Sequence, residues 1–302
     1  MSGRVVKGGE RYYRKPKREK HPALDLPSVA VGLLKAAFPS DGDHPSVTTI
    51  LSVLAKPALI GWAAKEERKM VSLIAGHLYG RLHDLVSEPP SPEKFAEMVD
   101  EEAGKPAQRR LLEKAASIGT EVHRRIEWTF KGELGLNRAD NEPPLTTKSA
   151  IRSFERWVEW RASVNLRVVA IEKQLFSQLY GFGGTLDALV ELGVDGKKVL
   201  ATIDFKTGKK VYEESFLQNV AYRMALAEEG IQSDMGIIVR LPKYEQDPDF
   251  DAVTVPADKT ETYKMVFIAL AIVYRWWKKP EDEAWKAKKR AAAGQNAKVS
   301  EK

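Results

Sequence analysis

Two aspartates and a lysine within one short stretch carry the groups that metal-assisted hydrolysis of a phosphodiester needs. The stretch, YGFGGTLDALVELGVDGKKVLATIDFK, covers residues 180–206 and reads as two strands joined by an Asp-Gly hairpin turn. Side chains alternate between the two faces of a strand, so Asp204 and Lys206 share one face of the second strand. Asp187 lies opposite the apolar face of the first strand. We therefore expect all three side chains to project from the same side of the hairpin.

This trio suits a metal site. Two neighbouring carboxylates repel each other unless a cation lies between them, and Mg²⁺ prefers carboxylate, water and phosphate oxygens. A lysine two residues further along the strand can approach the same phosphate or water, which completes the groups for metal-assisted hydrolysis. An isolated D-x-K can also be an exposed ion pair on a solvated face. Carboxylates are depleted in strand centres, which favours the metal site here.

The composition excludes several other classes of protein. The chain has 302 residues, of which 43% are hydrophobic and 30% charged, as in an ordinary globular protein. It contains no cysteine, which excludes disulfides and cysteine-ligated zinc or iron–sulfur sites. The longest apolar run, Met265 to Tyr274, is too short to span a bilayer, and the basic N-terminus lacks the apolar segment of a secretory signal. We therefore expect a cytoplasmic protein that makes no membrane contact.

The positive charge is concentrated at the two ends of the chain. The net charge of the whole chain is +6, residues 1–20 carry +6 and residues 278–302 carry +4, so the part between them carries −4. Cationic ends suit a polyanion such as nucleic acid. They can equally be solvated, disordered ends that aid solubility. The charge alone leaves both interpretations open.

The pattern of apolar residues predicts an α/β architecture. From Gln108 onward it indicates two helices, three strands, a helix, a strand and a helix, which together form a mixed sheet with helices packed on it. We expect four regions: a disordered basic arm (1–22), an N-terminal helical region packed on the core (23–107), the core itself (108–279) and a basic C-terminal tail (280–302).

Five short strings, in a fixed order, resemble the RecB-like exonucleases of the PD-(D/E)XK nuclease superfamily. They are GTEVHRRIE, IEKQL, GGTLD, IDFKTGK and QNVAY, and they span residues 119–222. Upstream, PSVTTILSVLAKPALIGWAAKE resembles a segment of phage and mitochondrial genome maintenance exonucleases. The resemblance implies a restriction-endonuclease-like core, a mixed central sheet flanked by helices, with an N-terminal helical elaboration.

The matched positions also imply roles for individual residues. Catalysis would rest on Asp187, Asp204 and Lys206, with the lysine orienting or activating the attacking water. The implied metal ligands are His123, Asp187, Asp204, the backbone carbonyl of Phe205 and, as an outer or transient ligand, Glu172. The implied DNA contacts are Gln218, Tyr222, Thr185 and Trp62.

The resemblance implies a Mg²⁺-dependent deoxyribonuclease, with Mn²⁺ able to substitute. We expect an exonuclease that acts on single-stranded DNA or free ends in replication, recombination or repair, in a bacterial or phage-infected cell. The chain lacks the cysteines of an iron–sulfur cluster and the phosphate loop of a helicase motor. We therefore expect the protein to act alone or with a separate partner such as a helicase, a recombinase or a single-strand-binding protein. The alternatives are a structure-specific endonuclease with the same site and a non-catalytic nucleic-acid-binding module.

Overall fold

A mixed five-stranded sheet forms the centre of the molecule. The structure is a computed structural model that describes residues 4–7, 10–13, 44–54, 57–85, 90–104, 106–136 and 141–277. The sheet has the order β4 (Leu166–Ser177), β5 (Phe182–Val194), β6 (Lys197–Thr207), β7 (Met235–Leu241) and β8 (Asp251–Thr254). Neighbouring strands run antiparallel except for the parallel pair β6 and β7.

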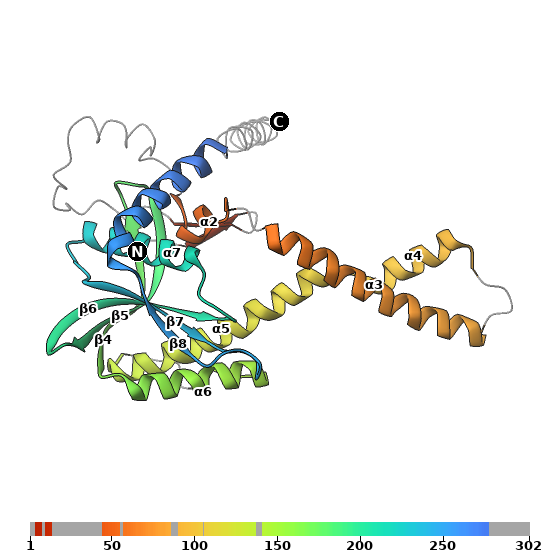
Figure 1. The fold of residues 1–302 in the computed structure, drawn as a ribbon, viewed down its shortest axis with the longest axis horizontal. Coiled ribbons are helices and arrows are strands. Elements are labelled where there is room, and N and C mark those ends of the chain that lie inside the picture. The colour runs from red at the N-terminus through yellow and green to blue at the C-terminus, as the bar shows by residue number, and fades with distance from the viewer. Residues whose placement is uncertain are drawn as a thin grey trace, which may run out of the picture.

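Helices cover both faces of this sheet (Figure 1). One face packs against α5 (Ala107–Glu133) and α6 (Lys148–Ser163). The other packs against α2 (Val47–Leu51), α7 (Glu213–Glu228) and a helix over residues 260–277. Parallel strands need a crossover connection, which α7 provides between β6 and β7. The expected α/β architecture, a mixed sheet flanked by helices, is confirmed.

The hairpin of β5 and β6 forms as its sequence predicts. Asp195 and Gly196 at the turn have φ of 48° and 74°, the left-handed conformations that a tight Asp-Gly turn requires. Ala188 and Val190 pack into the core on the α5–α6 side, in line with strand alternation. Leu186, which alternation places on that same face, instead packs into the core beneath α7. The side-chain alternation of β5 therefore changes next to Asp187.

The prediction of a disordered arm over residues 1–22 is wrong for two short segments. β1 (Arg4–Lys7) and β2 (Glu10–Tyr13) form an antiparallel pair, and β2 also pairs with β3 (His44–Pro45). The valines of β1 and the tyrosines of β2 favour strands, and the Gly-Gly between the two segments is a hairpin signal. The rest of the predicted arm and the predicted tail over 280–302 lie outside the described residues.

A helical arm reaches away from the sheet (Figure 1). It consists of α3 (Pro57–Leu85), α4 (Pro92–Ala103) and the first turns of α5. At 1.5 Å per residue, the 29 residues of α3 span about 43 Å. Met70, Ala103 and Ala107 form a small apolar cluster within this arm. Of the region 23–107, which is expected to pack on the core, α2 packs against the sheet, whereas the apolar contacts of α3 and α4 lie with each other and with α5. The part of this region before His44 lies outside the described residues.

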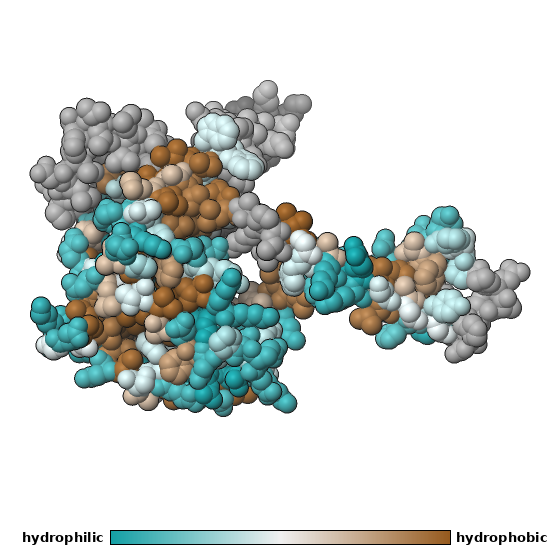
Figure 2. Space-filling view, in the orientation of Figure 1, coloured by the Kyte–Doolittle hydropathy of each residue, from teal (hydrophilic) through white to brown (hydrophobic). Residues whose placement is uncertain are grey.

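The helix over residues 260–277 is apolar on both of its faces. Tyr263 and Phe267 are buried against the core, whereas Met265, Ile272 and Trp276 are exposed. Figure 2 shows apolar surface in the region where Figure 1 places this helix. Among the described residues, no helix has both the length and the apolar character needed to cross a membrane.

Candidate metal centre

The candidate site lies at a fork where β5 and β6 separate. The two strands pair from Val194 and Lys197 back to Ala188 and Ile203. Beyond that point β6 continues along β7, and the earlier part of β5 continues along β4. At the fork, Asp187 Oδ2 accepts a hydrogen bond of 2.7 Å from the backbone N–H of Phe205. A side-chain carboxylate thus replaces the backbone carbonyl that a continuous sheet would supply.

The carboxylate of Asp204 is fully buried in this fork. Its Oδ2 forms an ion pair with Lys206 Nζ at 2.6 Å, and its buried Oδ1 has neither an ion pair nor a hydrogen bond among the described residues; neither oxygen meets the geometric criteria of a hydrogen bond. Burial raises the pKa of Asp204 to about 6, with Lys206 opposing this rise and Asp187 adding to it. A buried carboxylate oxygen without a partner is costly, and a bound cation would remove that cost.

Lys206 is a cation in this environment. Burial disfavours its ammonium form, but the carboxylates of Asp204 and Asp187 outweigh burial, so the pKa of Lys206 is raised. Its side chain remains about one-third exposed, so it is accessible from outside the fork. A protonated lysine can orient water or stabilise negative charge, but it cannot accept a proton.

His123 reaches the fork from α5. Its Nε2 lies 2.9 Å from the carbonyl oxygen of Phe205 and its Nδ1 lies 3.7 Å from Asp187 Oδ2. Since a carbonyl oxygen only accepts, Nε2 carries a hydrogen in this contact. The Phe205 carbonyl, expected as a metal ligand, therefore already accepts a hydrogen bond and retains one lone pair.

Glu172 joins the site through an unusual backbone conformation. One ligand atom from each of His123, Glu172 and Asp187 lies within 4.8 Å of the others. Glu172 has a φ of 42°, in the left-handed region that non-glycine residues rarely adopt. Its neighbours in β4 pair with Ala188 and Leu186, so Glu172 lies across from Asp187. Strain of this kind concentrates at functional sites, which supports a role for Glu172.

The donor set fits a hard divalent cation. The group formed by His123, Glu172 and Asp187 offers two carboxylates and one imidazole, ligands that a hard divalent cation can accept. Asp204 is not in the 4.8 Å group of His123, Glu172 and Asp187. Phe205 connects the two parts, because its backbone N–H and C=O bond to Asp187 and His123.

The expected DNA contacts are brought together in part. Gln218 Nε2 donates to Tyr222 Oη at 2.8 Å, on the face of α7 that looks toward the sheet. The Tyr222 ring packs against Gly184, where an added Cβ would overlap the ring. Thr185 lies half-buried in β5, two residues before Asp187. Trp62 is half-buried on α3, in the helical arm, and is not one of the residues that line the pocket described next.

A pocket of about 320 Å³ opens beside Lys206, between α2, the end of β6 and the start of α7. The sequence prediction placed Lys206 and Gln218 in the site but missed Thr48, Lys210 and Tyr212, which also line this pocket. The available signal was the run K-T-G-K-K, in which two further lysines closely follow Lys206.

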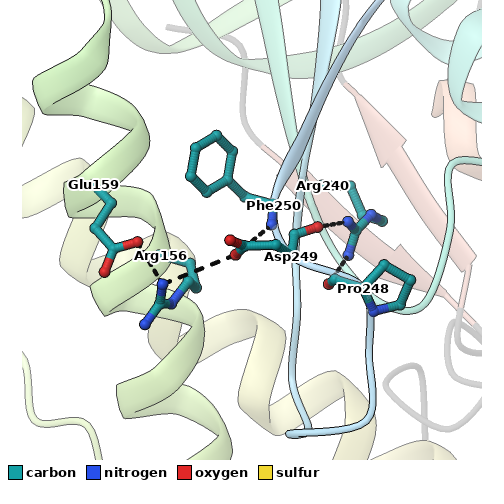
Figure 3. Close-up of polar contacts among 6 residues, drawn as sticks. All are labelled: Arg156, Glu159, Arg240, Pro248, Asp249 and Phe250. Atoms are coloured by element: carbon teal, nitrogen blue, oxygen red, sulfur yellow. Dashed lines mark hydrogen bonds and ion pairs between the residues drawn. The ribbon is translucent and has the colours of Figure 1, made fainter.

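Arg240 anchors the loop that follows β6. It is buried, and its guanidinium donates to the carbonyl oxygens of Gly208 at 3.3 Å, Pro248 at 3.1 Å and Asp249. Figure 3 shows Arg240 reaching Pro248 and Asp249, and Arg156 of α6 lying between Glu159 and Asp249. Gly208 N–H also donates to the carbonyl of Leu241 at 3.1 Å. The loop beside the pocket is therefore fixed to β7 and to the segment after it.

Comparisons with known proteins add little to this geometry. No protein-family profile and no curated protein matches the chain. Among solved structures, the crystal structure of SSO0001 is similar at a TM-score of 0.30 and 13% sequence identity, covering 70% of this chain and 85% of that one. A similarity this low carries no argument, so the function of the site has to be inferred from its own residues.

Proposed function

We propose that this protein is a metal-dependent deoxyribonuclease of the RecB-like type, with a PD-(D/E)XK core. The observation that carries the proposal is the buried carboxylate of Asp204, which has an unpartnered oxygen and lies beside Lys206. The strand order supports it, because the strand bearing D-x-K lies between its hairpin partner and a parallel strand. Asp204, Lys206 and Asp187 thus lie together at the fork between β5 and β6.

Mg²⁺, or Mn²⁺ in its place, would be held by Asp187 and Asp204, with His123, Glu172 and the Phe205 carbonyl completing the donor set. When bound, such an ion neutralises the acidic field, polarises phosphoryl oxygens and lowers the pKa of water. Lys206 is about one-third exposed beside Asp204, so its ammonium could contact the phosphate or the attacking water from this side of the fork.

The other residues position the substrate. Lys206, held as a cation by its two acidic neighbours, stabilises the negative charge that develops on the phosphate. Gln218 lines the pocket beside Lys206, where its amide can contact a backbone phosphate. The cationic ends of the chain supply the long-range attraction to nucleic acid that the acidic middle part lacks.

The proposed substrate is single-stranded DNA or a strand end, in replication, recombination or repair. We further propose that the protein works with a separate helicase, recombinase or single-strand-binding protein in the cytoplasm of a bacterial or phage-infected cell. A non-catalytic binding module would have no need for the complete set of acids and lysine at the fork.

End-labelled linear strands, linear duplexes and closed circles, each incubated with Mg²⁺, with Mn²⁺ and with EDTA, test the proposal. We expect metal-dependent loss of the linear substrates and survival of the circles. Cleavage of circles would identify an endonuclease with the same site. Intact DNA under every condition would contradict nuclease activity.

A further inference from the structure

We propose that the pocket beside Lys206 binds a phosphate monoester at the end of a nucleic acid strand. This inference rests on the proposed function, because it assigns the strand end that the same site would process. The pocket measures about 320 Å³, at the small end of the roughly 300–1,000 Å³ range of ligand sites. It therefore suits one terminal group rather than a run of nucleotides.

The lining of the pocket is suited to a doubly charged anion. Lys210 and Lys206 supply two ammonium groups, of which that of Lys206 is also paired with Asp204. Thr48 and Ser52 supply hydroxyls, and Glu214 is the acidic member of the lining. A phosphate monoester carries a charge of about −1.5 to −2 at pH 7 and three acceptor oxygens. An internal phosphodiester carries a single negative charge. The monoester is therefore the better match for two lysines.

Lys210 is available for this role. Its Nζ lies 5.0 Å from the centre of the Tyr212 ring, a cation–π arrangement between two residues that both line the pocket. Among the described residues, Lys210 makes no ion pair. Tyr212 is itself exposed, and its ring offers a surface on which a terminal base can stack.

Both walls of the pocket are fixed before any ligand arrives. On one side, Ser46 Oγ accepts from Thr49 N–H at 3.0 Å and caps α2, and Ser46 also forms a bridge with Gly183 of β5. On the other side, Arg240 and the carbonyl of Leu241 hold Gly208. A preformed pocket binds its ligand without first paying to order its own walls.

The position of the pocket connects end binding to cleavage. Lys206 lines the pocket and also contacts Asp204 in the fork. A strand whose terminal phosphate lies in the pocket would therefore present an adjoining phosphodiester to the metal centre. This placement favours an exonuclease over an endonuclease.

Binding measurements with fluorescent single strands test the inference. The strands carry a phosphate at the 5′ end, at the 3′ end or at neither end, and anisotropy is recorded in EDTA and, with Asp187→Asn protein, in Mg²⁺. We expect one phosphorylated end to bind about tenfold more tightly than its hydroxyl counterpart, as a charge-assisted contact implies. The end that is preferred identifies the source of the phosphate.

Lys210→Ala should abolish this preference, and Lys209→Ala is the matched control because it removes the same charge from a residue outside the pocket lining. Equal affinity for all three strands in both conditions, or a preference that survives in Lys210→Ala, would overturn the inference. Cleavage without any end preference would overturn this inference alone. An end preference that depends on Lys210 in a protein that never cleaves would overturn the nuclease proposal alone.

Discussion

The carboxylate of Asp187 accepts a hydrogen bond from the backbone N–H of Phe205, just beyond Ala188 and Ile203, the last paired residues of β5 and β6. The same side chain thus closes the fork of the sheet and faces His123 in the candidate metal centre. Because Asp187 has these two roles, its substitution by asparagine and by alanine should have different effects. Asparagine keeps an oxygen that can accept the hydrogen bond, whereas alanine removes it.

Asp187→Ala should therefore destabilise the fold by about 1–3 kcal/mol, the cost of leaving a buried N–H without a partner. Asp187→Asn should unfold in urea within about 0.5 kcal/mol of the unsubstituted protein. Urea unfolding of both variants in EDTA checks this difference. Equal stability of the alanine and asparagine variants would show that the bond at the fork contributes nothing.

Asp204 should make the metal-free protein less stable as pH rises. Its folded pKa of about 6 lies above 3.8, the ordinary pKa of an aspartate, so the folded state binds more protons between these two pH values. Stability from this group is full below about pH 4 and is lost as pH rises to about 6. The loss is at most about 3 kcal/mol, for a shift of about two units.

Asp204→Asn removes this dependence, so its stability relative to the unsubstituted protein should increase from pH 4 to pH 6 in EDTA. Thermal unfolding of both proteins across that range measures the difference. If the stability of Asp204→Asn relative to the unsubstituted protein stayed constant or decreased from pH 4 to pH 6, the pKa of Asp204 would not be raised by folding.

Binding of a divalent metal ion should offset the free-energy cost of burying the carboxylate of Asp204. A ligand that binds only the folded state stabilises it by about 2.7 kcal/mol at a hundred times its Kd. We expect Mg²⁺ to raise the Tm of the unsubstituted protein and to leave the Tm of Asp204→Asn unchanged. Asp251→Asn is the control, because Asp251 is an exposed acid on β8. A similar rise in all three proteins would indicate nonspecific binding.

Gly184 should tolerate no side chain. A Cβ at this position would overlap the buried ring of Tyr222, whereas at Gly193 of the same strand nothing lies within 4 Å. Overpacking of this kind costs about 1–3 kcal/mol. Gly184→Ala should lower stability by that amount and disturb the bond between Gln218 and Tyr222, and Gly193→Ala should do neither. Urea unfolding compares the two, and equal losses would refute the contact.

Much of the sheet and the hairpin could be predicted from the sequence, because strand alternation and an Asp-Gly turn are local signals. The fork could not, because alternation assumes continuous pairing and Asp187 replaces a backbone partner at the point where pairing ends. The left-handed φ of Glu172 was likewise beyond prediction, since glutamate rarely adopts it. β8 was missed because it is only four residues long and largely exposed.

The pocket was missed for a different reason. Thr48 and Lys210 lie 162 positions apart in the chain, and only the packing of α2 beside α7 brings them to one pocket. The packing of the helical arm could not be predicted because the apolar residues of a helix indicate that it is buried, but not which element it packs against. For α3 that partner proved to be α4 and α5 rather than the sheet.

The most direct test of the central claim is the rate at which Asp187→Asn and the unsubstituted protein degrade an end-labelled linear single strand in Mg²⁺. Asparagine preserves the bond to Phe205, so a loss of rate reports on the metal centre rather than on folding. We expect degradation by the unsubstituted protein in Mg²⁺, none in EDTA, and none above background by Asp187→Asn. Degradation by Asp187→Asn at the unsubstituted rate, or by the unsubstituted protein in EDTA, would contradict it.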